Sequence, residues 1–192
     1  GHDINDLPVS WLRPQMAFVP QEPFLFSMSA LDNIGFGLDG EYENRVEDAA
    51  RLASLDAEVS SFEAGYETLI GERGVSLSGG QRQRMTIARA AAMQPVIWVF
   101  DDCLSSVDAA TEQKIIRNLR ERTEKTTAVF VSHRLLGFEA VDRIFVLDKG
   151  RIVEQGQHQE LVDAGGWYSR LYGRQRLTED LSETKGAPEV RD

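Results

Sequence analysis

Four polar side chains that follow apolar runs have the types and spacing of a phosphate-handling site. Asp101 and Asp102 directly follow the apolar run of residues 96–100, and Gln21 and His133 each follow another such run. Mg²⁺ prefers oxygen ligands and keeps several waters, so Asp101 is a candidate metal ligand, with Gln21 as a second. Asp102 is a candidate for polarising an attacking water. His133 is a candidate hydrogen-bond donor to a terminal phosphate.

Each of these residues also has an ordinary structural interpretation. Paired aspartates at a strand end commonly open a turn, with odds of about one in two, because Asp has a high turn propensity. A single His or Gln in a loop is more often a solvated side chain. Taken singly, none of the four residues decides the function.

A second candidate site is the segment Ser78-Gly79-Gly80-Gln81, which precedes a helical pattern. Two glycines leave backbone N–H groups unobstructed at a helix start, where the helix dipole favours an anion such as phosphate. The alternative is a capping box, with Ser78 at the N-cap and Gln81 three residues later. The capping box explains the Ser and the Gln but leaves both glycines unexplained.

The elements that must position these residues form an α/β pattern. Apolar runs predict strands, and the run at 96–100 is typical of a strand covered on both faces of a parallel sheet. A strand, an amphipathic helix and a second strand form a βαβ unit. The predicted elements are strands at 16–19, 96–100 and 127–131, a mostly helical stretch at 29–95, a helix at 109–122, and a hairpin of 143–147 with 151–154. In that hairpin, Gly150 is expected to supply the positive φ of a tight turn.

Composition excludes several classes of protein. The 192 residues carry a net charge of −10, which argues against a nucleic-acid partner because phosphate backbones need a concentrated basic footprint. Cys103 is the single cysteine, so an intramolecular disulfide is excluded. The longest apolar run, 96–100, is far shorter than the roughly 18 residues that span a bilayer, so we expect a soluble chain without direct membrane insertion.

Residues 77–84, Leu-Ser-Gly-Gly-Gln-Arg-Gln-Arg, resemble the signature motif of ATP-binding-cassette (ABC) nucleotide-binding domains. Gln21 resembles the Q-loop, residues 96–102 the Walker B strand, residues 105–108 the D-loop and residues 132–134 the H-loop. Residues 24–27, 32–34 and 71–74 resemble the exporter branch, where the last of these segments includes the X-loop facing the transmembrane helices. The resemblance covers roughly residues 1–172.

The resemblance implies a fold, cofactors and site residues. The fold is α/β, a mostly parallel sheet of the P-loop NTPase kind with an inserted helical subdomain at about 29–95. Residues 173–192, outside the resemblance, are polar and lack an apolar period, which predicts a disordered tail. The cofactors are ATP and Mg²⁺. The implied catalytic residues are Asp102, His133 and Gln21, the metal ligands are Asp101 and Gln21, and the nucleotide contacts are Ser78, Gly79, Gly80, Gln81 and Asp108.

Two departures from the family pattern shape the expected function. The 192 residues contain no Gly-x-x-x-x-Gly-Lys-Ser/Thr string, so we expect an N-terminally truncated cassette that is inactive alone. Asp102 stands where the family usually has Glu, and the shorter side chain withdraws a base that contributes about 10²–10⁴-fold. The implied protein is the degenerate-site half of a heterodimeric exporter, which binds ATP but hydrolyses it slowly.

The implied partners are a second nucleotide-binding domain, which receives the signature motif in a homodimer or, by preference, a heterodimer, and the transmembrane domain of the same parent chain. The implied location is the cytoplasmic face of a membrane. Two alternatives remain open: a non-transport ABC ATPase or regulatory clamp, and an inert α/β fragment. The environment of Glu72, within residues 71–74, discriminates the clamp from the exporter.

Overall fold

The computed structural model describes residues 2–71, 75–124, 126–135, 137, 139 and 141–185, with side chains as far as residue 178. It divides the chain into two compact units, residues 1–132 and 133–192, whereas the sequence predicted one domain through 172. The first unit contains η1 (Ile4–Asp6), α1 (Val9–Leu12), η2 (Arg13–Gln15), β1 (Met16–Val19), α2 (Ala30–Ile34), α3 (Glu43–Leu52), α4 (Asp56–Ser60), η3 (Gly65–Glu67), α5 (Gly79–Ala92), β2 (Ile97–Asp101), α6 (Ala109–Thr123) and β3 (Thr127–Val131). The second contains β4 (Ile144–Asp148), β5 (Arg151–Gly156), α7 (His158–Asp163) and α8 (Trp167–Lys185).

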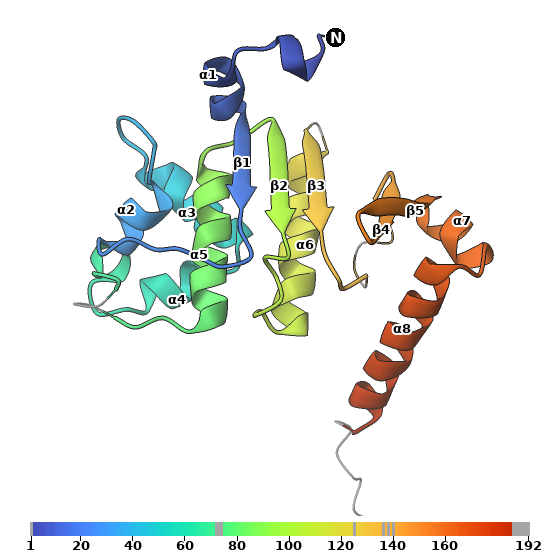
Figure 1. The fold of residues 1–192 in the computed structure, drawn as a ribbon. Helices are drawn as coiled ribbons and strands as arrows, with labels where there is room; N and C mark the ends of the chain where they lie inside the picture. The colour runs from blue at the N-terminus through green and yellow to red at the C-terminus, as the bar shows by residue number, and fades with distance from the viewer. Residues whose placement is uncertain are drawn as a thin grey trace, which may run out of the picture. The chain divides into compact units, whose positions relative to one another are not determined.

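Within the described residues, β1, β2 and β3 form a parallel sheet in that order (Figure 1). Val19 pairs with Phe100, and Phe100 pairs with Phe130, so the three strands end at the same edge. Parallel neighbours require crossover connections, which α2–α5 and α6 provide. The predicted parallel α/β sheet is therefore confirmed.

The two faces of the sheet differ in burial, and the expectation that the central strand is covered on both faces holds in part, because Ile97 and Val99 on its second face have intermediate burial. Trp98 and Phe100 are buried on one face, with apolar side chains of α5 and α6 completing the core. On alternate positions, Phe18, Val129 and Val131 are about half exposed. Strand side chains alternate between faces, and a continuous apolar run does not reveal which face is covered.

The helical stretch predicted at 29–95 comprises α2, α3, α4 and α5, separated by loops. The buried Asn33 of α2 donates its amide to the carbonyls of Phe26, Met28 and Ser29. Arg89 of α5 donates to the carbonyl of Asn33 at 2.7 Å. These bonds satisfy the loop backbone and fix it against α5, the helix that begins at the glycine pair.

The second unit opens with the predicted hairpin, whose turn has positive φ at both Lys149 and Gly150. The structure differs from the prediction at the tail, because α8 continues to Lys185 where we predicted disorder from 173. Tyr168 is 2% exposed and anchors the start of this helix. The polar sequence around it did not predict that burial. Residues 186–192 of the predicted tail lie outside the described residues.

Candidate functional site

Two of the candidate residues meet at the carboxyl edge of the sheet. Asp101 is the last residue of β2, and the backbone N–H of Asp102 donates to the carbonyl of Val131 at 2.8 Å. The Gln21 amide Nε2 donates to Oδ2 of Asp102 at 3.4 Å. The structure thus brings together side chains 81 residues apart because parallel strands present their carboxyl ends on one side.

The donor set at this edge fits Mg²⁺ held jointly with a nucleotide. Asp101 and Asp102 are consecutive carboxylates at the end of β2, and the Gln21 carboxamide donates its nitrogen to Asp102 and carries an oxygen of the hard type that Mg²⁺ prefers. The described residues contain no group of three or more His, Cys, Asp or Glu side chains that would enclose a metal by themselves. Mg²⁺ is usually bound by one or two carboxylates plus phosphate oxygens, so this open arrangement suits it.

Gln83 is a supporting residue that sequence reasoning missed. It lies on α5, is 1% exposed, and donates its Nε2 to the backbone carbonyl of Gln21 at 3.1 Å. Its Oε1 is buried and has no hydrogen-bond partner among the described residues. The sequence signal for this role was the i, i+4 spacing of Gln83 and Ile87, which places the amide on the same helix face as a buried apolar residue. Gln83 fixes the loop from which Gln21 reaches Asp102.

The start of α5 has the capping-box geometry considered from the sequence. The N–H of Gln81 donates to Ser78 Oγ at 3.2 Å, and the N–H of Ser78 donates to Gln81 Oε1 at 2.9 Å. Gln81 Nε2 also donates to the Glu58 carboxylate at 2.9 Å. Ser78 and Gln81 therefore have structural roles within the chain, whatever further contact they make.

The two glycines of this segment have different surroundings. A Cβ on Gly80 would lie 3.0 Å from the backbone carbonyl oxygen of Ser106, so close approach of two backbones explains this glycine. A Cβ on Gly79 would meet nothing nearer than Ser106 Cβ at 3.8 Å, which is ordinary contact. Contacts within the described chain account for Gly80 only, and Gly79 stays available for a ligand or partner backbone.

Asp108 caps α6. Its Oδ1 accepts the N–H of Thr111 at 3.0 Å, and this backbone hydrogen bond lowers the pKa of the Asp108 carboxyl. A deprotonated carboxylate at a helix N-terminus is the ordinary structural role of Asp. Contact of Asp108 with nucleotide remains a prediction.

His133 belongs to the second unit, whereas Gln21, Asp101 and Asp102 belong to the first. The His133 carbonyl accepts a hydrogen bond from Gln175 Nε2 at 2.8 Å. Gln175 lies in α8, inside the stretch predicted to be disordered, and its contact with this loop was not foreseen.

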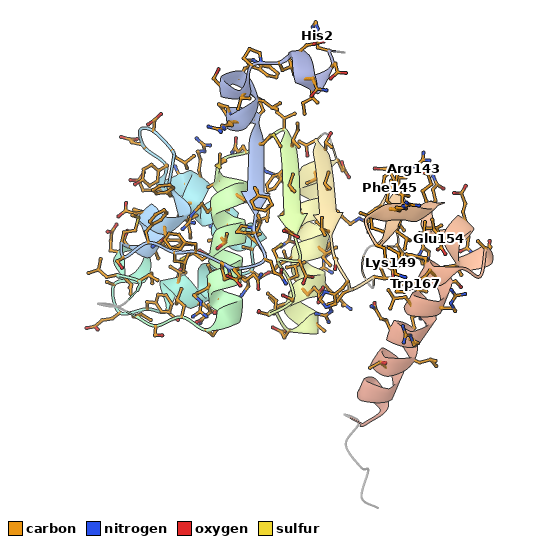
Figure 2. All side chains as sticks on the ribbon, viewed as in Figure 1. His2, Arg143, Phe145, Lys149, Glu154 and Trp167 are labelled. Carbon is orange, nitrogen blue, oxygen red and sulfur yellow. The ribbon has the colours of Figure 1, made fainter. Side chains whose placement is uncertain are left out.

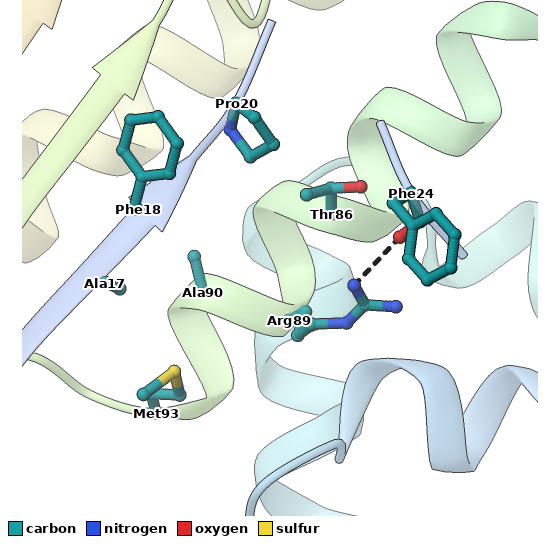
Figure 3. A pocket seen from close by; sticks show the side chains of 8 residues that line it. All are labelled: Ala17, Phe18, Pro20, Phe24, Thr86, Arg89, Ala90 and Met93. Atoms are coloured by element: carbon teal, nitrogen blue, oxygen red, sulfur yellow. Dashed lines mark hydrogen bonds between the residues drawn. The ribbon is translucent and has the colours of Figure 1, made fainter. Parts of the chain in front are cut away.

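A small pocket of about 110 Å³ lies between β1 and α5 (Figure 3). The Arg89 guanidinium donates to the Phe24 carbonyl at 2.9 Å there, and burial lowers the pKa of Arg89. The pocket lining is mostly apolar and holds no carboxylate: Ala17, Phe18, Pro20, Phe24, Thr86, Arg89, Ala90 and Met93. This pocket does not have the chemistry of a metal or hydrolysis site.

The family model for the ABC transporter matches residues 1–105, more than half of the chain. The chain belongs to the ABC transporter family. A probable multidrug resistance ABC transporter ATP-binding/permease protein of Bacillus subtilis is 42% identical over 92% of this chain and 30% of its own length.

Two further relatives extend the likeness. The mitochondrial potassium channel ATP-binding subunit of mouse is 40% identical over 100% of this chain and 27% of its own length. The solved structure of a bacterial Atm1-family ABC exporter with ATP bound has a TM-score of 0.85 and 38% identity, over 92% of this chain and 31% of that one. The likeness confirms the ABC cassette fold and the exporter and multidrug type of the relatives.

The chain spans about 30% of the length of these relatives. Among the described residues, no helix is long and apolar enough to cross a membrane. Glu72, which we singled out for discriminating the exporter from a clamp, lies outside the described residues. The activity of the whole protein is therefore a matter for proposal.

Proposed function

We propose that this chain is part of the ATP-binding subunit of an ABC exporter, which couples ATP binding and hydrolysis to transport across a membrane. The observation that carries the proposal is the Gln21 amide on the Asp102 carboxylate at the carboxyl edge of a parallel sheet, in a chain with exporter relatives. ATP and Mg²⁺ are the cofactors.

Each site residue has a proposed role. Asp101 and Gln21 hold Mg²⁺, which neutralises charge on the phosphates when bound. Asp102 polarises the attacking water, and His133 donates a hydrogen bond to the terminal phosphate. The residues offered to the second cassette's nucleotide are Ser78, Gly79, Gly80, Gln81 and Asp108.

We further propose that this site is the slow one of a heterodimer. Asp102 is one methylene shorter than Glu, so its carboxylate is withdrawn from the water that it would align. The capped start of α5 keeps the signature segment in order for the partner's site. The proposed partners are a second nucleotide-binding domain and a transmembrane domain of the parent chain, at the cytoplasmic face of the membrane.

The test uses the full-length transporter in its natural pairing. Asp102→Glu is expected to raise ATP hydrolysis at this site, measured as turnover with the partner's site inactivated. Asp163→Glu, on α7, is the matched control and leaves turnover unchanged. If Asp102→Glu leaves turnover unchanged as well, the degenerate-site proposal is wrong.

The mitochondrial potassium channel relative favours one second candidate, a regulatory ATP-binding subunit. Crosslinking from Glu72 in the complete protein distinguishes the exporter subunit from the regulatory subunit. Crosslinks to membrane-embedded helices of the parent support the exporter. Crosslinks only to a separate protein support the regulatory subunit.

A further inference from the structure

Gln175 of α8 holds the segment after β3 at two backbone positions. Its Nε2 donates to the His133 carbonyl at 2.8 Å, and its Oε1 accepts the N–H of Leu135 at 2.8 Å. A carboxamide offers one donor edge and one acceptor edge, as a peptide group does. This single side chain therefore pairs with the loop as a neighbouring strand would.

The start of α8 is anchored independently of this contact. Figure 2 labels Glu154 of β5 and Trp167 at the start of α8. The Glu154 carboxylate accepts the backbone N–H groups of Tyr168, at 2.9 Å, and of Trp167, and these bonds lower the pKa of Glu154. The buried Tyr168 places its hydroxyl 2.8 Å from His158 Nδ1. The position and the rotation of the helix are thus set at its first turn.

Gln175 lies on the anchored face of α8. Tyr168, Tyr172 and Gln175 are spaced i, i+4 and i+7, which places them on one side of a helix. The Tyr172 ring stacks on Tyr168 with centroids 6.1 Å apart, and its hydroxyl donates to the Glu139 carboxylate at 3.3 Å. The helix therefore presents Gln175 to the loop from a fixed register.

We propose that Gln175 is a positioning residue that fixes His133 for contact with the terminal phosphate of ATP. The inference rests on the proposed function, which assigns that phosphate to His133. Holding the His133 carbonyl and the Leu135 N–H fixes the backbone from which the imidazole projects, so fewer backbone conformations have to be excluded when nucleotide binds. Such preorganisation lowers the entropic cost of binding. The C-terminal helix thereby acts on nucleotide selection through His133.

The experiment measures ATP and ADP affinity in the full-length protein, by competition against photolabelling of this chain with an azido-ATP. Gln175→Leu is expected to lower ATP affinity about tenfold, in line with loss of a hydrogen bond to a charged group. ADP affinity stays unchanged because ADP lacks the terminal phosphate. His133→Ala gives the same selective loss, and adding Gln175→Leu to it causes no further loss.

Two variants complete the test. Gln159→Leu removes a glutamine of α7 that donates only to Asp163 Oδ1, and it is expected to leave both affinities unchanged. Gln175→Glu keeps the acceptor for Leu135 but sets a carboxylate oxygen against the His133 carbonyl, so the selective loss recurs even if Gln175→Leu folds poorly. An equal fall in ATP and ADP affinity, or an unchanged ratio in both Gln175 variants, overturns the inference. A parent protein that binds neither nucleotide overturns the proposed function and this inference with it.

Discussion

The Glu58 carboxylate accepts hydrogen bonds from both terminal nitrogens of Arg84, at 2.7 and 2.9 Å. Arg84 also donates to the Ser54 carbonyl at 2.6 Å, and Gln81 donates to the same carboxylate. Glu58 therefore joins α4 to α5 at two positions, Gln81 and Arg84, and Arg84 in turn joins α5 to the loop before α4.

Glu58→Gln is expected to destabilise the chain by about 1–2 kcal/mol, since hydrogen bonds to a charged group are lost. The Arg84 hydrogen bonds lower the pKa of Glu58. A lowered carboxyl pKa means that the stabilisation is present above the unfolded pKa and is lost as pH falls through the folded pKa. In urea unfolding, the difference between wild type and variant should shrink as pH drops below about 4.3. A difference that is constant from pH 7 to pH 3 contradicts this interpretation.

Gly80→Ala and Gly79→Ala form a matched pair. The methyl group at residue 80 meets the Ser106 carbonyl oxygen at 3.0 Å, so we expect a loss of about 1–3 kcal/mol in the free energy of unfolding. The methyl group at residue 79 has room, and alanine favours a helix over glycine, so stability should hold or rise. Thermal melting measures both, and equal losses would show that the Ser106 contact is not decisive.

Gln83→Met tests the link from α5 to the site. The variant keeps the buried volume but loses the donor to the Gln21 carbonyl, so we expect the half-saturating Mg²⁺ for ATP photolabelling to rise about tenfold. Gln21→Ala should cause a similar rise, and the double variant no more than either alone. Thr86→Val, which removes another buried hydrogen bond from α5, is the control and leaves Mg²⁺ dependence unchanged. Additive effects in the double variant would show that Gln83 acts by another route.

Cys103 is expected to resist alkylation in the folded chain. It is 3% exposed, and burial raises its pKa to about 12. The thiolate is the reactive form, so labelling by iodoacetamide should stay slow up to pH 9 and become fast in urea, where the ordinary thiol pKa applies. Rapid labelling of the folded chain at pH 8 would mean that the loop after β2 opens readily.

The sheet and the site edge were predictable because their signals are local. Apolar runs mark β1, β2 and β3, and the rule that parallel strands share a carboxyl edge brings Gln21 to Asp102. The capping box was visible in the spacing of Ser78 and Gln81. Each of these depends on residues close in sequence or on a general property of parallel sheets.

The contacts that were missed join segments distant in sequence. Gln83 reaches Gln21 across 62 residues, and Gln175 reaches His133 across 42. A glutamine in a helix looks like a solvated residue until the facing backbone is known. The polar composition after residue 173 likewise concealed a helix, because Tyr168 and Glu154 fix its start from outside the tail.

The backbone at Asp102 has φ of 42°, in the left-handed region where Asp and Asn are several-fold enriched among non-glycine residues. A shorter acid therefore suits the turn, while a longer acid suits the water that must be aligned. Asp102→Glu is expected to raise ATP turnover because the longer side chain reaches the water. The same change is expected to lower the melting temperature slightly because Asp suits the left-handed backbone at this position. Asp102→Asn removes the charge and keeps the preference for the left-handed backbone. It therefore tests the role of the carboxylate without the conformational cost that Asp102→Ala would add.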